Sequence, residues 1–105
     1  MALPATPSAV LTLDGKSGLT ASFSIERTGG KKVDASKFYL MFQCLDANGN
    51  IGYETYEVVN WSNTDKTIGS NQFTVSPAGC NFKSYVFIGP SDGTIISNII
   101  TGILP

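Results

Sequence analysis

The stretch Phe38–Leu45, with the sequence FYLMFQCL, carries apolar side chains on both alternation phases of a β-strand. A second stretch, residues 82–88 with the sequence FKSYVFI, does the same over its last four residues. A strand with one face in water alternates apolar and polar residues, because successive side chains point to opposite faces. These two stretches therefore predict a sheet whose second face is also covered, and we expect a partner molecule to cover it.

Turn residues divide the rest of the chain into short β-strands. Seven candidate strands lie at residues 9–13, 19–27, 37–45, 53–61, 67–76, 82–88 and 94–103. Asp14-Gly15 together with Ser17-Gly18, Asn48-Gly49 and Asp92-Gly93 provide turns, since glycine adopts the positive φ that tight turns need. Gly69 predicts a β-bulge inside the fifth strand. No amphipathic segment longer than one helical turn is found, so the fold class is all-β.

Alternation assigns the two faces of the central strands. Leu19, Ala21, Phe23 and Ile25 share one face of their strand, opposite Thr20, Ser22, Ser24 and Glu26, which predicts one dry and one wet side. In the two apolar stretches, we expect Phe38, Leu40, Phe42, Val86 and Ile88 to point into the core. The side chains then left on the outside are Tyr39, Met41, Leu45, Tyr85 and Phe87. These five are our candidate interface residues, unless a loop or the N-terminal segment folds over them.

The length of 105 residues predicts a single domain at residues 8–105. The opening residues 1–7, which include Pro4 and Pro7, predict an extended linker. No apolar run is long enough for a membrane span, and the N-terminal residues do not resemble a secretion signal. The compartment is therefore left open, with a virion or a cell surface favoured.

Composition and charge argue against several functions. The chain has seven Lys and Arg against eight Asp and Glu, with a net charge of -1, so nucleic acid and membrane insertion are not expected. It has no histidine, which removes the commonest base of nucleophilic catalysis and the commonest metal ligand. We expect no enzyme, no catalytic residue and no cofactor.

Two carboxylate arrangements were weighed as chemical sites. Glu54 and Glu57 are three residues apart on a strand and so face opposite sides, unlike an acid/base pair. Four oxygen-bearing residues follow the spacing of a calcium loop: Asp46, Asn48, Asn50 and Glu57. The sixth position, where that loop needs glycine, is Ile51, so we expect a polar hairpin and no metal.

Residues 75–82, with the sequence VSPAGCNF, and the alternating strand after them resemble the fibronectin type III and bacterial immunoglobulin-like superfamily. The resemblance implies a seven-stranded antiparallel β-sandwich. Phe82 stands where the family usually has Tyr, and Ile25 where it usually has Trp, so the family's corner hydrogen bond is not expected. The last two thirds of the chain also resemble the C-terminal β domain of an uncharacterised bacterial family, through residues 85–88, 91–93 and 96–98.

The resemblance also bears on the two cysteines. Cys44 ends the third strand and Cys80 precedes the sixth, and in a type III sandwich these strands are antiparallel neighbours. A cross-strand disulfide is then one outcome, and two buried thiols are the other.

Two functions remain for the outer face. The first is a non-catalytic structural or protein-interaction module, such as a subunit of a virion, tail or cell-surface assembly, that docks through the sheet or associates with itself. The alternative is a carbohydrate-binding module, in which exposed aromatic residues stack on sugar rings. The aromatics proposed for stacking are Trp61, Tyr53 and Tyr56.

Overall fold

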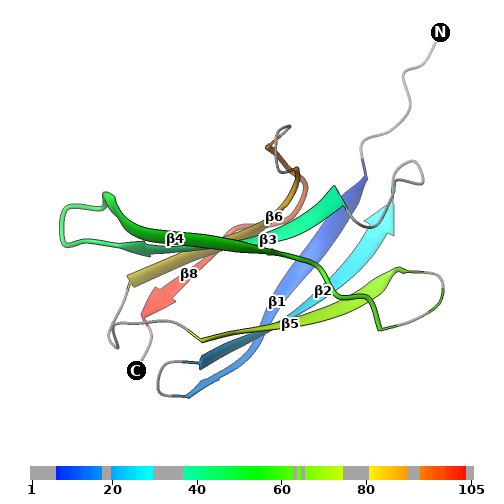
Figure 1. Ribbon diagram of the computed structural model, residues 1–105, viewed down its shortest axis with the longest axis horizontal. Helices are drawn as coiled ribbons and strands as arrows, with labels where there is room; N and C mark the ends of the chain where they lie inside the picture. The colour runs from blue at the N-terminus through cyan, green and yellow to red at the C-terminus, as the bar shows by residue number, and fades with distance from the viewer. Residues whose placement is uncertain are drawn as a thin grey trace, which may run out of the picture.

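The computed structural model describes residues 7–17, 20–29, 37–62, 64, 66–74, 81–89 and 93–103, and these residues form an all-β structure (Figure 1). Within them lie eight strands: β1 (Ser8–Ser17), β2 (Thr20–Gly29), β3 (Phe38–Leu45), β4 (Ile51–Val58), β5 (Ile68–Thr74), β6 (Asn81–Ile88), β7 (Thr94–Ile95) and β8 (Ile100–Ile103). No helix of the described residues has the length and apolar character needed to cross a membrane.

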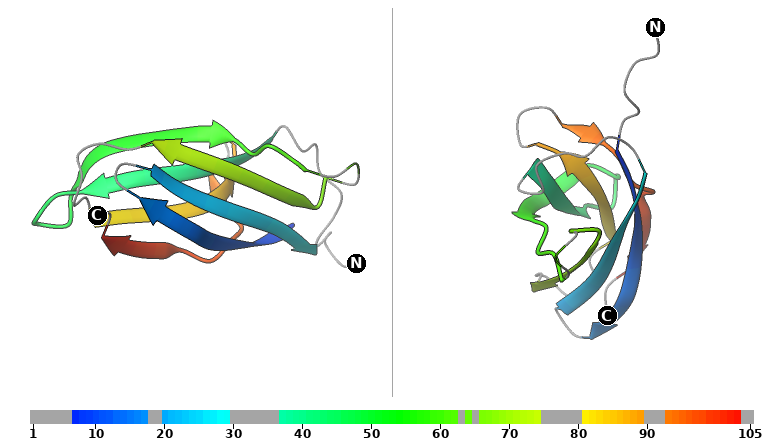
Figure 2. Two further views of the ribbon diagram at one scale, coloured as in Figure 1. Left: turned by 90° about the horizontal axis from the view of Figure 1, so that it is seen from below. Right: turned by 90° about the vertical axis from the view of Figure 1, so that its right-hand side faces the viewer.

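The strands form two antiparallel sheets. The first has the order β1-β2-β5, and the second has the order β4-β3-β6-β7, with β8 also paired to β6. Seen from the end, β1 and β2 lie in one layer and β3 and β6 in the other (Figure 2, right). The hairpin turn between β3 and β4 projects beyond the first sheet (Figure 1, left).

The core lies between the two sheets, and alternation explains its residues. Ala21, Phe23 and Ile25 of β2 are buried, as the sequence predicted, while Leu19 lies outside the described residues. The opposing sheet supplies a second row of buried side chains: Phe38, Leu40, Phe42, Phe82 and Val86. Phe42 stacks on Phe82 and on Phe73, with ring centroids 5.5 and 6.0 Å apart.

One side of the sandwich is closed by contacts between β1 and the C-terminal strands. The Ala9 N–H donates to the Ile96 carbonyl at 2.9 Å, and Ala9 forms a parallel bridge with Ser97. The Lys16 ammonium donates to the Ile103 carbonyl and lies 5.9 Å from the centre of the Phe82 ring. These contacts join the two sheets along a seam.

The seam explains why the last expected strand, residues 94–103, is divided into β7 and β8. Between the two, the Ile96 N–H donates to the Val86 carbonyl, and the Ser97 hydroxyl accepts from the Val86 N–H at 2.8 Å. The residues between β7 and β8 therefore form hydrogen bonds with both β6 and β1. Of the expected linker at residues 1–7, the structure describes Pro7, which is buried.

Two turn and bulge predictions were wrong. The turn expected at Asp14-Gly15 is a strand, because β1 continues to Ser17 and its register shift between Leu13 and Gly15 absorbs the extra residue. The bulge expected at Gly69 is absent, since the register of β2 and β5 runs through Ile25 and Gly69 without interruption. By contrast, Gly49 and Gly93 have φ angles of 83° and 75°, as their turns require.

Candidate functional site

The outer face of the β4-β3-β6-β7 sheet carries the expected apolar side chains. The register places Tyr39 between Val58 and Phe87, and Met41 between Tyr56 and Tyr85. Ile95 of β7 lies opposite Phe87 and extends the first row. Because directly paired residues share a face, these side chains form one surface. We call this surface the outer patch; it consists of Tyr39, Met41, Tyr56, Val58, Tyr85, Phe87 and Ile95.

The centre of the outer patch is an aromatic cluster. Phe87 stacks on Tyr39 at 5.6 Å between ring centroids and meets Tyr56 edge-on at 5.9 Å and Tyr85 at 6.1 Å. As a result, Phe87 is only 4% exposed and Met41 only 9%. Both residues face outward, as the alternation predicted, yet they are buried, because neighbouring side chains of the same face cover them.

The rim of the outer patch is open to water. Tyr56 is 48% exposed, Val58 42% and Ile95 45%. Tyr39 and Tyr85 are half-buried between them. The face therefore combines a packed aromatic centre with an exposed apolar rim.

Leu45, the fifth candidate interface residue, is separated from the outer patch. A row that includes Glu54, Gln43 and Lys83 lies between them. Gln43 is buried, and its amide donates to the Glu54 carboxylate at 2.8 Å. Leu45 itself is half-buried beside Ile51, at the far end of the sheet. The structure thus brings together four of the five candidates.

The same Glu54 carboxylate affects the tyrosine at the edge of the cluster. The pKa of Tyr85 is raised from its ordinary value of 10.0, first by burial of the phenol and second by repulsion from Glu54. Both effects disfavour the phenolate. Tyr85 therefore stays neutral and contributes an apolar ring with a hydroxyl to the patch.

The carboxylates that the sequence singled out lie in separate surroundings in the described structure. Glu54 faces outward, while Glu57 pairs with Leu40 on the other face. The Asp46 carboxylate accepts the backbone N–H groups of Asn48 at 2.8 Å and Asn50 at 2.9 Å, so it caps the hairpin turn. Among the described residues, no three His, Cys, Asp or Glu side chains are grouped as metal ligands would be.

The three aromatics proposed for sugar stacking do not share a surface. Trp61 is half-buried and meets the core residue Phe38 edge-on at 5.7 Å. Tyr53 pairs with Cys44 on the core-side face of β4, whereas Tyr56 belongs to the outer patch. The two tyrosines lie on opposite faces of β4, and the tryptophan ring packs against the end of the core.

Cys44 is buried on the core-side face of β3 and is disulfide-bonded. The sequence has one other cysteine, Cys80, which lies outside the described residues. The Cys44–Cys80 pairing therefore stays a prediction.

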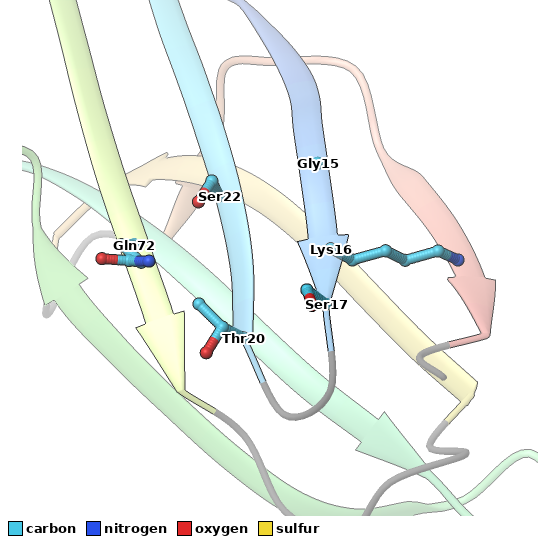
Figure 3. A pocket seen from close by; sticks show the side chains of 6 residues that line it. All are labelled: Gly15, Lys16, Ser17, Thr20, Ser22 and Gln72. Carbon is cyan, nitrogen blue, oxygen red and sulfur yellow. The ribbon is translucent and has the colours of Figure 1, made fainter.

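A shallow hollow of about 550 Å³ lies on the opposite side of the molecule, at the end of the β1-β2-β5 sheet. Figure 3 shows its lining residues: Gly15, Lys16, Ser17, Thr20, Ser22 and Gln72. The Lys16 side chain points away toward β8, which leaves hydroxyl and amide groups around the hollow.

Sequence reasoning missed two residues of the outer patch, Val58 and Ile95. Their signal was present, because each lies on the alternation phase that faces outward on its strand. Recognising it required the pairing of β4 and β7 with their neighbours.

Comparison with solved structures finds several chains of similar fold. The fold is similar to part of the crystal structure of an endonuclease/exonuclease/phosphatase from Beutenbergia cavernae DSM 12333, with a TM-score of 0.40 and 12% sequence identity. The match covers 96% of this chain and 27% of that protein. No protein-family model matches the chain, and no curated protein matches it.

Proposed function

We propose that this chain is an immunoglobulin-like, fibronectin type III-like sandwich that acts as a non-catalytic structural or protein-interaction module. The outer patch is the docking surface, and its partner is a protein. A virion, a tail or a cell-surface array is the kind of assembly in which such a module serves.

The strand order supports the fold assignment. In an immunoglobulin constant domain, the first, second and fifth strands share one sheet, and the third, sixth and seventh share the other. The same grouping is found here, with β7 and β8 together in the place of the seventh strand. The fourth strand differs, because β4 joins β3 where a constant domain pairs it with the fifth strand.

The single observation that carries the docking proposal is the exposed rim of Tyr56, Val58 and Ile95 around a buried aromatic centre. Burying apolar surface contributes about 25 cal/mol per Å², so a partner gains most where such side chains are contiguous. Tyrosine is also among the residues enriched at the energetic centres of interfaces. The absence of histidine from the chain supports a non-catalytic role.

A photocrosslinking amino acid at position 95 tests the proposal in the cells that make the protein. Position 10 is the matched control, since Val10 is 47% exposed on the outer face of the other sheet. We expect position 95 to join to one protein, identified by mass spectrometry, and position 10 to give none. Equal products from both positions, or none from position 95, would contradict docking through the outer patch.

A further inference from the structure

We infer that two copies of this chain pair along β4, in antiparallel orientation about a two-fold axis at Thr55, to form one continuous sheet. This interface is formed by the backbone edge of β4. The outer patch also includes two β4 side chains, Tyr56 and Val58, but edge pairing is argued from the backbone groups and register of β4 and does not depend on docking through the patch.

The first observation is that β4 is an open edge strand. Within the described part of the chain, β4 pairs with β3 and with no other strand. All its side chains are exposed except that of Thr55, which is half-buried. In the left view of Figure 2, β4 lies along the outermost side of the molecule. This edge strand has eight residues and contains no Lys or Pro, two residues that commonly block pairing at an edge; its charged side chains are Glu54 and Glu57.

The second observation identifies the backbone groups at the edge. The Val59 N–H donates to the Phe38 carbonyl at 2.8 Å, which makes Phe38 and Val59 a hydrogen-bonded pair. Such pairs alternate along an antiparallel ladder, so Glu54, Tyr56 and Val58 direct their backbone groups away from β3. The Val58 carbonyl accepts from the Asn71 amide at 3.2 Å. Glu54 and Tyr56 are therefore the two residues whose N–H and C=O groups both suit a new strand.

The third observation identifies the register of the two β4 strands and indicates that the partner is a second copy of the chain. With the axis at Thr55, Glu54 of each copy lies opposite Tyr56 of the other, and the two residues exchange four backbone hydrogen bonds across the axis. On the other face, Tyr53 lies opposite Glu57. No acidic side chain then faces another, which matters because like charges directly opposite each other are destabilising.

The two neighbouring registers are worse. Moving the axis to Glu54 sets the two Glu54 carboxylates opposite each other. Moving it to Tyr56 sets Glu54 opposite Val58, whose carbonyl already accepts a hydrogen bond. The strand is thus complementary to its own copy in one register, as a two-fold interface requires.

Cysteine trapping tests this register directly. At a two-fold position without hydrogen bonds between the paired residues, the Thr55 Cα atoms lie about 4.5 Å apart, within the range that a disulfide spans. Glu57→Cys is the matched control on the same face of the same strand. Its two copies lie about 14 Å apart in this register, too far for a disulfide.

We expect Thr55→Cys to give a covalent dimer in most chains under mild oxidation, and Glu57→Cys to give at least tenfold less. Peptide mapping identifies the joined cysteines, and circular dichroism verifies that both variants are folded. Equal crosslinking of both variants, or none of Thr55→Cys, overturns the inference.

Sedimentation of the unmodified chain gives a second, independent measurement. We expect a reversible dimer that Thr55→Lys weakens at least tenfold, because two lysines would meet across the axis. Thr101→Lys, on the exposed β8, is expected to leave the dimer intact. A chain that stays monomeric at all concentrations, or a dimer insensitive to Thr55→Lys, rejects edge pairing while leaving the outer-patch proposal standing.

Discussion

The side-chain amide of Asn98 forms two hydrogen bonds with the backbone of Leu11. It donates to the Leu11 carbonyl at 2.9 Å and accepts from the Leu11 N–H at 2.8 Å. An asparagine side chain has one acceptor and one donor group in the geometry of a peptide, so it replaces a strand partner at this point. These two hydrogen bonds complete the seam between β1 and the C-terminal strands, at the point where the last expected strand is divided into β7 and β8.

Replacing Asn98 tests how much this link contributes. Asn98→Ala leaves both Leu11 backbone groups without that partner, and we expect a loss of about 1–3 kcal/mol in the free energy of unfolding. Urea denaturation followed by tryptophan fluorescence measures it. Asn48→Ala, in the exposed hairpin turn, is the control and is expected to change stability by less than about 0.5 kcal/mol.

Asn98→Asp keeps the side-chain oxygen that accepts from Leu11 but removes the amide group that donates to Leu11. At neutral pH the carboxylate accepts from the Leu11 N–H but meets the Leu11 carbonyl with a second oxygen, so the variant is destabilised. Below the pKa of the new carboxyl group the acid can donate again. We therefore expect part of the loss, measured against the unsubstituted chain, to be recovered at low pH; a pH-independent difference would argue against the bidentate link.

Gly69 is a position where a close approach requires glycine. A Cβ atom there would lie 2.8 Å from the Asn60 carbonyl oxygen and 2.8 Å from a methyl carbon of Val59. We expect Gly69→Ala to cost about 1–3 kcal/mol, as overpacking does, measured by urea denaturation.

Gly15→Ala is the matched control for Gly69→Ala, because a Cβ atom at Gly15 meets nothing within 4 Å. It restricts the unfolded chain, so we expect unchanged or slightly higher stability. A Gly69→Ala variant as stable as Gly15→Ala would show that β5 moves easily away from residues 59–60.

The raised pKa of Tyr85 predicts that the folded chain loses stability in alkaline solution. Its pKa in the folded chain is raised, so between the ordinary pKa of 10.0 and the folded value the unfolded state releases a proton that the folded state retains. Stability from this residue is therefore complete below pH 10 and falls as the pH rises through that window. Tyr85→Phe removes this contribution.

The measurement compares urea midpoints of the unsubstituted chain and Tyr85→Phe between pH 8 and pH 11. We expect a constant difference up to about pH 10, followed by a relative gain for Tyr85→Phe. Glu54→Gln is expected to reduce the alkaline loss by a smaller amount, because repulsion from Glu54 is the second cause of the shift. Parallel curves for all three proteins would contradict the raised pKa.

The predicted Cys44–Cys80 disulfide is tested by intact mass after alkylation of the unfolded chain without reductant. We expect no added alkyl groups, and two after reduction. Since a disulfide chiefly restricts the unfolded chain, we expect Cys44→Ala/Cys80→Ala to lose about 2–4 kcal/mol. Two alkyl groups without reductant would establish free thiols.

Local alternation in the sequence was enough to predict the all-β class and the inward faces of the central strands. Phe23, Phe38, Leu40 and Phe42 are buried where alternation placed them, because a strand has only two faces and the apolar one is driven from water. The outward positions of Tyr39 and Tyr85 followed from the same rule. The positive φ of Gly49 followed from turn chemistry.

Tertiary structure decided which outward residues meet and which are covered. Phe87 and Met41 are buried because strands distant in sequence place tyrosines beside them, and alternation within one strand carries no information about its neighbours. The same limit applies to the division of the last strand, since Asn98 replaces a strand partner only when β1 lies beside it. Sequence alone determined the faces of each strand, whereas the pairing of strands, which depends on long-range packing, determined the composition of the surface.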